Sequence, residues 1–287
     1  MLKYSQNFIN NTKILEECFK YISIPENEPV VEIGGGKGII TDMLLEKFEN
    51  ITVVEFDNNL FQKLQKKYAC HPAVQIVHKD FLQHSLPTEK FNIIANIPFN
   101  VTANIIRKIT GSDSNMQNAY LIMQKEAALK FVTNESKSET SLLSNLIQIR
   151  YTIEFLTTVN RRNFSPQPKH DAAFVHFARK QHSIFANEDQ EEIFHDFLCF
   201  IFNRSKPLIN DALVDIIPRK VATQILQKLK IKNNRRIKTL TFDEWLSVFN
   251  NIDFTLNESA KSTIRGSYRK LIKEQKGLQK VHRTRKY

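Results

Sequence analysis

Four of the chain's seven glycines lie within residues 34–38, which read G-G-G-K-G. This cluster follows an apolar run at 30–33 and precedes a second apolar-rich run at 39–45. The pattern predicts a buried strand, a turn too tight for large side chains and the start of a helix. Backbone N–H groups at such a turn can approach a nucleotide-like ligand; a tight turn that binds nothing is the alternative.

The spacing of the glycines indicates the kind of ligand. A dinucleotide-binding turn reads G-x-G-x-x-G, and counted from Gly34 its third glycine would fall on Ile39. The observed pattern is E-x-G-x-G-x-G, starting at Glu32. We therefore expect an adenosyl cofactor, smaller than a dinucleotide, over this turn.

The rest of the chain predicts an α/β fold with two domains. A length of 287 residues is too great for a single core, and strands alternate with helices up to about residue 180. Such alternation builds a Rossmann-like parallel sheet that binds ligands at the carboxyl ends of its strands. From about residue 186 only helices are predicted. We expect a catalytic domain at 1–180 and a small all-helical domain at 181–287. Expected strands are 30–33, 51–55, 74–77, 91–95, 120–123, 151–159 and 173–178; expected helices are 12–22, 39–45, 59–68, 101–109, 190–202, 219–229 and 241–249.

Basic residues are concentrated in the second domain. Residues 1–180 hold 21 Lys/Arg against 18 Asp/Glu, whereas residues 181–287 hold 20 against 12. From Lys261 onward there are ten basic residues and one acid, Glu274. This distribution favours a polyanionic partner such as RNA, since Lys/Arg that neutralise phosphates release counterions. A basic tail that only aids solubility is the alternative.

Cysteine usage and hydropathy indicate the compartment. Cys18, Cys70 and Cys199 are isolated and lack C-x-x-C spacing, so neither a disulfide framework nor a zinc site is predicted. The N-terminus lacks a signal-peptide pattern, and no apolar run is long enough to span a membrane. We expect a cytoplasmic monomer that binds neither membrane nor metal.

Two acids follow the predicted strands in the order that a nucleoside-binding sheet requires. Glu55 ends the second strand, where a carboxylate can accept both ribose hydroxyls, and Asp80 ends the third, suitably placed for the adenine amine. Either acid alone would more often be a helix cap or a solvated loop charge. Their succession at the ends of consecutive strands favours cofactor contacts.

The most informative segment is Asn96-Ile97-Pro98-Phe99, at the end of the fourth strand. An Asn carbonyl and a backbone carbonyl held by the neighbouring proline can accept both hydrogens of an exocyclic amine, and an aromatic ring can stack on the base. Because the lone pair of an adenine amine is delocalised into the ring, such acceptors assist methyl transfer. Seen alone, an Asn-x-Pro sequence is also a common turn.

Taken together, these segments resemble the ribosomal RNA adenine N-6 dimethyltransferases over roughly residues 4–178. That family combines an S-adenosylmethionine-binding Rossmann-like domain with a small helical domain that helps to hold RNA. The segments that carry the resemblance are 5–8 (S-Q-N-F), 32–38 (E-I-G-x-G-x-G), 55–57 (E-F-D), 80–81 (D-F), 96–100 (N-I-P-F-N), 123–126 (M-Q-K-E) and 164–169 (F-S-P-Q-P-K).

The resemblance implies roles for particular residues. Asn96, Ile97 and Phe99 fall on the positions that hold the target amine, and Phe164 falls on a second aromatic that stacks near the flipped adenine. The implied cofactor contacts are Asn7, Ile9, Gly34, Gly36, Glu55, Phe56, Asp80, Phe81 and Asn96.

Two branches of the family compete. Ile97, the Phe164 segment and residues 240–246 look more like the Erm type, which modifies one adenine of 23S rRNA and gives resistance to macrolide, lincosamide and streptogramin B antibiotics. We expect this type; a KsgA-type enzyme acting on small-subunit rRNA is the alternative. Departures from the Erm pattern are Phe99, where Tyr is commonest, the segment 170–173 and the extended basic end.

Two rivals come from other classes of protein. A non-catalytic nucleic-acid-binding protein is disfavoured by the intact glycine turn. A DNA adenine methyltransferase is disfavoured because Ile97 stands between Asn96 and Pro98.

Overall fold

The computed structural model describes residues 7–132, 139–252 and 258–274. These residues form two compact units. Unit 1 holds 7–132 and 150–181, and unit 2 holds 139–149, 182–252 and 258–274.

Unit 1 is built on a seven-stranded sheet with the order β4-β3-β2-β5-β6-β9-β7. The first five of these strands are parallel, and β9 is antiparallel to both of its neighbours. The predicted α/β class and Rossmann-like sheet are confirmed. The strands are β2 (Val30–Ile33), β3 (Ile51–Glu55), β4 (Val74–His78), β5 (Phe91–Asn96), β6 (Met116–Gln124), β7 (Tyr151–Val159) and β9 (Ala172–Arg179).

The central strands explain why this part of the fold could be predicted. All four residues of β2 are buried, and five of the six residues of β5 are buried. Strands covered on both faces read as continuous apolar runs, which is the pattern of a parallel sheet wrapped by helices. Unit 1 carries α1 (Thr12–Phe19), α2 (Ile39–Leu45), α3 (Asn58–Lys67), η1 (Phe99–Val101), α4 (Thr102–Ile109), α5 (Lys125–Leu129) and η2 (Arg161–Asn163).

A two-stranded sheet joins distant parts of unit 1. β1 (Phe8–Ile9) pairs antiparallel with β8 (Phe164–Ser165), so that Ile9 lies opposite Phe164. Each strand has only two residues, too few for a periodic pattern, and neither was predicted. The pairing carries the N-terminal segment across the glycine turn, where a Cβ on Gly36 would lie 3.1 Å from the Phe8 ring.

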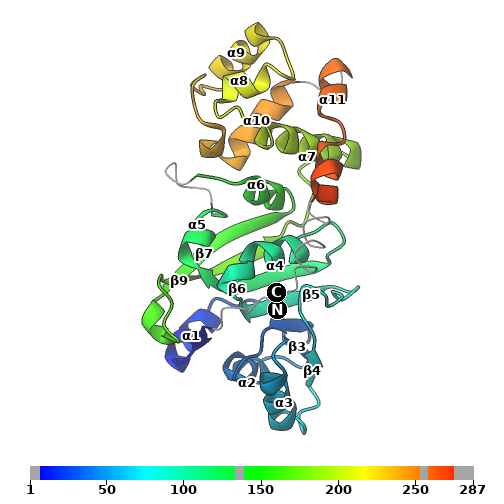
Figure 1. Cartoon of the computed structure of the whole chain (residues 1–287). Coiled ribbons are helices and arrows are strands. Elements are labelled where there is room, and N and C mark those ends of the chain that lie inside the picture. Colours follow the sequence, from blue (N-terminus) through cyan, green and yellow to red (C-terminus); the bar gives the residue numbers. More distant parts are fainter. Residues whose placement is uncertain (1–6, 133–138, 253–257, 275–287) are drawn as a thin grey trace, which may run out of the picture. The chain divides into compact units, whose positions relative to one another are not determined.

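The regular elements of unit 2 among its described residues are helices, and in Figure 1 no strand lies among the elements drawn in yellow, orange and red. Its core is rich in aromatic side chains: Phe194, Phe197 and Trp245 are fully buried, and Phe249 packs against both phenylalanines. The helices are α6 (Leu142–Gln148), α7 (Glu188–Phe202), α8 (Ile209–Leu213), α9 (Arg219–Lys228), η3 (Ile237–Thr239), α10 (Phe242–Ile252) and α11 (Glu258–Ile264).

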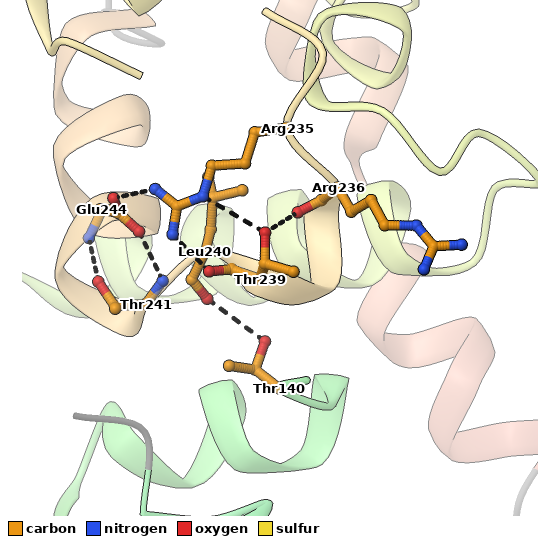
Figure 2. Close-up of polar contacts among 7 residues, drawn as sticks. All are labelled: Thr140, Arg235, Arg236, Thr239, Leu240, Thr241 and Glu244. Carbon is orange, nitrogen blue, oxygen red and sulfur yellow. Dashed lines mark hydrogen bonds and ion pairs between the residues drawn. The ribbon is translucent and has the colours of Figure 1, made fainter. Parts of the chain in front are cut away.

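Residues 139–149 belong to unit 2, although the predicted boundary placed them in the first domain. The Thr140 amide donates to the Lys238 carbonyl at 2.6 Å, and the Thr140 hydroxyl donates to the Leu240 carbonyl at 3.3 Å. Figure 2 shows this contact beside Arg235, which donates to Thr239 and pairs with Glu244. The two Thr140 bonds join segments about a hundred residues apart, which local sequence patterns cannot indicate.

Two further findings concern the hydropathy of the helices and the state of the cysteines. Among the described residues no helix is long and apolar enough to cross a membrane. Cys18, Cys70 and Cys199 are all free thiols, two of them buried and Cys70 exposed.

Candidate functional site

A cavity opens in unit 1 at the carboxyl ends of β2, β3, β4 and β5. It encloses about 780 Å³ not filled by protein atoms, part of it open to solvent. Its position follows from the topology, because parallel strands end at the same edge of a sheet and leave a crevice there. The lining residues are Asn7, Phe8, Ile33, Gly34, Gly36, Val54, Glu55, Phe56, Asp57, Leu60, Lys79, Asp80, Phe81, Leu82, Asn96, Ile97, Pro98, Val101 and Ile105.

The glycine turn forms one wall of the cavity. Gly34 has a φ of 74°, and a Cβ added to it would meet no atom within 4 Å. A Cβ on Gly35 would lie only 2.4 Å from a methyl carbon of Val53. The turn thus packs its backbone against β3 on one side and leaves open space above Gly34 on the other, which suits a ligand lying over the backbone.

Glu55 closes the cavity at the end of β3. It is 5% exposed, and its two carboxylate oxygens accept from the amides of Gly36 at 2.9 Å and Asp57 at 2.8 Å. A carboxylate has about four acceptor positions, so ribose hydroxyls can still bind to it. The bond to Gly36 adds a role that the sequence did not reveal: Glu55 also fixes the glycine turn.

Asp80 begins a turn at the end of β4. Its Oδ1 accepts from the Leu82 amide at 2.9 Å, and its carbonyl accepts from the Gln83 amide at 2.8 Å. Lys108 reaches over from α4 and donates to the carbonyls of Phe81 and His84. Burial lowers the pKa of Lys108, and the Asp80 charge opposes this shift. The turn that carries Asp80 is therefore fixed at both ends.

The side-chain amide of Asn96 is held in one orientation at the end of β5. Its Nδ2 donates to the Asn7 carbonyl at 2.8 Å, whereas its Oδ1 is buried and has no partner among the described residues. A buried acceptor without a donor costs on the order of 1–3 kcal/mol. The site therefore presents a carbonyl oxygen that lacks a donor, next to the rigid Ile97-Pro98 backbone.

The aromatic pair Phe99 and Phe164 is not part of the cavity lining. The rings of Phe99 and Phe164 meet edge to face with centroids 6.3 Å apart. Phe164 is only 3% exposed, and Phe99 is half-buried against the same core. In this structure Phe164 packs against Phe99. Ile9 is likewise buried, opposite Phe164 in the β1–β8 pair.

A second hollow adjoins the cavity beneath the glycine turn, lined by Phe8, Glu32, residues 34–36 and Asn96 among others. Glu32 is fully buried; its Oε2 accepts from the Thr41 hydroxyl at 2.6 Å, and its Oε1 has no partner among the described residues. Burial raises the pKa of Glu32 to about 8, a shift that the Thr41 hydrogen bond opposes.

The structure brings most of the predicted site residues together. Of these, Asn7, Gly34, Gly36, Glu55, Phe56, Asp80, Phe81, Asn96 and Ile97 line the cavity, whereas Ile9, Phe99 and Phe164 lie beside it. Ser5 and Gln6 lie outside the described residues.

Several lining residues were missed, chiefly Phe8, Leu60, Val101 and Ile105. The apolar spacing of Val101 and Ile105 in the helix after Pro98 is the signal that could have identified them.

Within the described part of the chain, no group of three or more His, Cys, Asp or Glu side chains is placed to hold a metal ion. The polar side chains that line the cavity include the carboxylates of Glu55 and Asp80, the amide of Asn96 and the ammonium group of Lys79, and the space above Gly34 is open. These features fit an adenosyl group with a methionine side chain.

Comparisons with known proteins find a family match and related proteins. The model of the ribosomal RNA adenine dimethylase family matches residues 2–253. A ribosomal RNA small subunit methyltransferase A from Fusobacterium nucleatum subsp. nucleatum is 29% identical over 251 residues, which cover 86% of this chain and 95% of that protein. An rRNA adenine N-6-methyltransferase from Bacillus licheniformis is 28% identical over 246 residues, covering 85% and 84%.

A solved structure shares the fold. The 23S rRNA methyltransferase ErmE superposes with a TM-score of 0.78 at 24% identity, covering 86% of this chain and all of that chain. At this identity the similarity concerns the fold alone. Taken with the family match, the cavity and its acceptors lead to one conclusion: the chain belongs to the ribosomal RNA adenine dimethylase family of S-adenosylmethionine-dependent enzymes.

Proposed function

We propose that this chain transfers methyl groups from S-adenosylmethionine to the N6 amine of an adenine in small-subunit ribosomal RNA. The observation that carries the proposal is the fixed Asn96 amide, whose unpartnered Oδ1 lies at the edge of the adenosyl-sized cavity. The choice of the small subunit is supported by relatives named as small-subunit methyltransferases. It replaces the Erm-type expectation as the main hypothesis.

Glu55, Asp80 and the glycine turn would hold the cofactor. Glu55 would accept hydrogen bonds from the ribose hydroxyls, and the Asp80 turn would face the adenine amine. The open space above Gly34 leaves room for the cofactor against the backbone. When bound, S-adenosylmethionine supplies an electrophilic methyl group on its positively charged sulfur.

Asn96 and the Ile97 carbonyl would act on the target amine. Asn96 Oδ1 would accept one N6 hydrogen and the Ile97 carbonyl the other. As N6 would form its bond to the methyl carbon, the bond from that carbon to the positively charged sulfur would break and positive charge would develop on the amine. Both oxygens would stabilise this charge more strongly than in the ground state, and the surplus N6 proton would then pass to water. Donation of Asn96 Nδ2 to the Asn7 carbonyl keeps the correct oxygen facing the amine.

Phe99 would stack on the adenine. An enzyme that acts on a base must take it out of its stack, at a cost of a few kcal/mol. Stacking on an aromatic side chain recovers ~1–3 kcal/mol per base. Because Phe164 is buried and packs against Phe99, we assign to it the support of that ring and keep direct stacking on the base as a prediction.

A second candidate is the Erm-type reaction on 23S rRNA, which would confer macrolide resistance. The observations that favour it are Ile97, the Phe164 segment and the relatives named rRNA adenine N-6-methyltransferase. Both candidates use the same cavity and differ only in the RNA that delivers the adenine.

Primer extension on rRNA from cells expressing the chain decides between them, because dimethyladenine stops reverse transcriptase. We expect a new stop in small-subunit rRNA of a host that lacks its own enzyme, and none with Asn96→Ala. A stop confined to 23S rRNA, accompanied by macrolide resistance, would establish the second candidate instead. Absence of a stop in both RNAs would contradict the proposed activity.

A further inference from the structure

Residues 258–274 form a C-terminal arm that lies outside the family match, which ends at residue 253. The arm consists of α11 and a second helical segment at 267–274, joined through Gly266. Figure 1 shows α11 beside α7, and the two helices are in contact within unit 2. The arm is therefore an addition to the matched fold that has its own docking site on α7.

Apolar contacts hold the first half of the arm. Ala260 and Ile264 are buried, at 0% and 1% exposure, and belong to the aromatic core of unit 2. They lie four residues apart, so both project from one face of α11. The first helix of the arm therefore turns its apolar side toward the core of unit 2.

A buried carboxylate on α7 fixes the second half. Asp196 is 3% exposed, and its oxygens accept from the amides of Gly266 at 2.7 Å and Tyr268 at 2.8 Å. The first amides of a helix lack partners within the helix. Asp196 therefore caps the segment 267–274 from a different helix. Gly266, with a φ of 80°, allows the chain to turn at this point.

Further contacts surround this cap. Lys261 pairs with Asp189 at 3.1 Å, and Arg269 pairs with Glu192 at 2.8 Å. Asp189, Glu192 and Asp196 are three and four residues apart and share one face of α7. This acidic face of α7 therefore pairs with two basic side chains of the arm and accepts two of its backbone amides. These contacts fix the position of the other basic residues of the arm.

Three basic side chains of the arm have no side-chain partner among the described residues: Arg265, Lys270 and Lys273. All three are exposed. Lys270 and Lys273 are three residues apart in a helix, so their Cβ atoms lie ~5–6 Å apart on one face. Exposed cations arranged on a rigid support are suited to a chain of phosphates.

We propose that the C-terminal arm is an additional RNA-binding element, docked by Asp196, in which Arg265, Lys270 and Lys273 contact the phosphate backbone of the substrate RNA. The proposal deepens the proposed function, on which the identity of the RNA rests. Asp196 is a positioning residue: it fixes the arm, and the arm's cations bind.

The first test removes charge and leaves the dock intact. Affinity for rRNA falls as salt rises, so the slope of log affinity against log salt is negative. We expect the triple variant Arg265→Gln, Lys270→Gln, Lys273→Gln to reduce the magnitude of this slope by up to about 2.1–2.7, at 0.7–0.9 per phosphate contact. The matched control neutralises three exposed lysines of unit 1, Lys63→Gln, Lys66→Gln and Lys90→Gln. The control should keep the parent slope. Equal slopes for the triple variant and the parent, or no salt-dependent binding by the parent, overturn the proposal.

The second test releases the dock. In Asp196→Asn the side chain keeps one acceptor oxygen, so one of the two amides loses its partner. We expect hydrogen exchange at that amide, of Gly266 or of Tyr268, to accelerate at least about tenfold. The salt slope should fall in the same direction as in the triple variant, with cofactor affinity unchanged. If hydrogen exchange accelerates but the slope of log affinity against log salt stays at the parent value, the positioning role of Asp196 is refuted. Methylation, measured separately by primer extension, reports on the proposed function, so a chain that binds RNA through the arm but does not methylate would be recognised as such.

Discussion

At the scale of single residues, the orientation of the Asn96 amide is the central feature. The amide has two polar ends, and the bond from Nδ2 to the Asn7 carbonyl determines which end remains for the substrate. A flipped amide would present a donor to an amine that needs an acceptor.

We expect Asn96→Ala to lower turnover about a hundredfold or more while changing cofactor affinity less than about tenfold, because the acceptor acts mainly in the transition state. Single-turnover methylation and calorimetry measure the two quantities. Asn59→Ala, an exposed change on α3, is the control. Equal turnover in the Asn96 variant and the parent would remove Asn96 from the mechanism.

Glu55→Ala should act on cofactor binding. Charged hydrogen bonds contribute roughly 1.5–3 kcal/mol, so we expect affinity to fall about ten- to a hundredfold, with Glu55→Gln in between. Because Glu55 also holds the Gly36 amide, the melting temperature should fall as well. Glu49→Ala, at an exposed position, should change neither quantity. Unchanged cofactor binding by calorimetry would argue decisively against this assignment.

Glu32 makes stability depend on pH. Burial raises its pKa from 4.5 to about 8, so the folded chain binds this proton more tightly than the unfolded chain does. Its contribution to stability is therefore complete below about pH 4.5 and is lost as pH rises towards 8, at ~1.4 kcal/mol per pKa unit at most. In cofactor-free protein, Glu32→Gln should melt progressively higher than the parent between pH 5 and pH 8. Melting curves that stay parallel across this range would contradict a raised pKa.

At the scale of elements, two neighbouring glycines of the glycine turn have different roles: one contributes to the stability of the fold and the other leaves room for the cofactor. Gly35 packs against β3, and an added methyl group there would overlap Val53, whereas Gly34 faces open space. Overpacking typically costs ~1–3 kcal/mol. We expect Gly35→Ala to lower the melting temperature of the cofactor-free protein more than Gly34→Ala does. Gly34→Ala, despite the strain at its φ of 74°, should chiefly weaken cofactor binding, as calorimetry would measure. The reverse ranking would show that Gly34 does not face the ligand.

Unit 2 shows how a capping pattern is reinforced by distant contacts. Thr241 and Glu244 form reciprocal side-chain-to-backbone bonds at the start of α10, a pattern visible in the sequence. Arg235 then pairs with Glu244, and Thr140 joins the Leu240 carbonyl (Figure 2). The local cap was predictable, whereas its partners Arg235 and Thr140 were not.

At the scale of the whole molecule, the positive charge of the arm extends into the residues that follow it in the sequence. Residues 275–287 lie outside the described residues and carry five Lys/Arg. We expect their deletion to weaken RNA binding and to leave cofactor binding intact. The magnitude of the slope of log affinity against log salt should fall by up to about 3.5–4.5, at 0.7–0.9 per phosphate contact. Filter binding of parent and truncated chain at several salt concentrations measures this. Superimposable slopes would assign RNA binding to the rest of the chain.

The sequence by itself determined the sheet of unit 1 and the acceptors at its strand ends. Buried parallel strands are continuous apolar runs, and a residue that follows such a run lies at the ligand-binding edge whatever the rest of the chain does. For this reason Gly34, Glu55 and Asn96, at the ends of the buried strands β2, β3 and β5, could be identified from the amino-acid pattern alone. Asp80 follows the less buried strand β4, and all four residues line one cavity.

Only the tertiary structure decided how these groups are held. The Asn7 carbonyl on Asn96, the assignment of residues 139–149 to unit 2 and the docking of the arm by Asp196 join residues about 70 to 100 positions apart. Each of these three features depends on one or two hydrogen bonds, and residues that form such single bonds show no periodic pattern in the sequence. Their formation depends on loop closure and packing, which bring distant backbone groups within hydrogen-bond distance only once the two cores have formed.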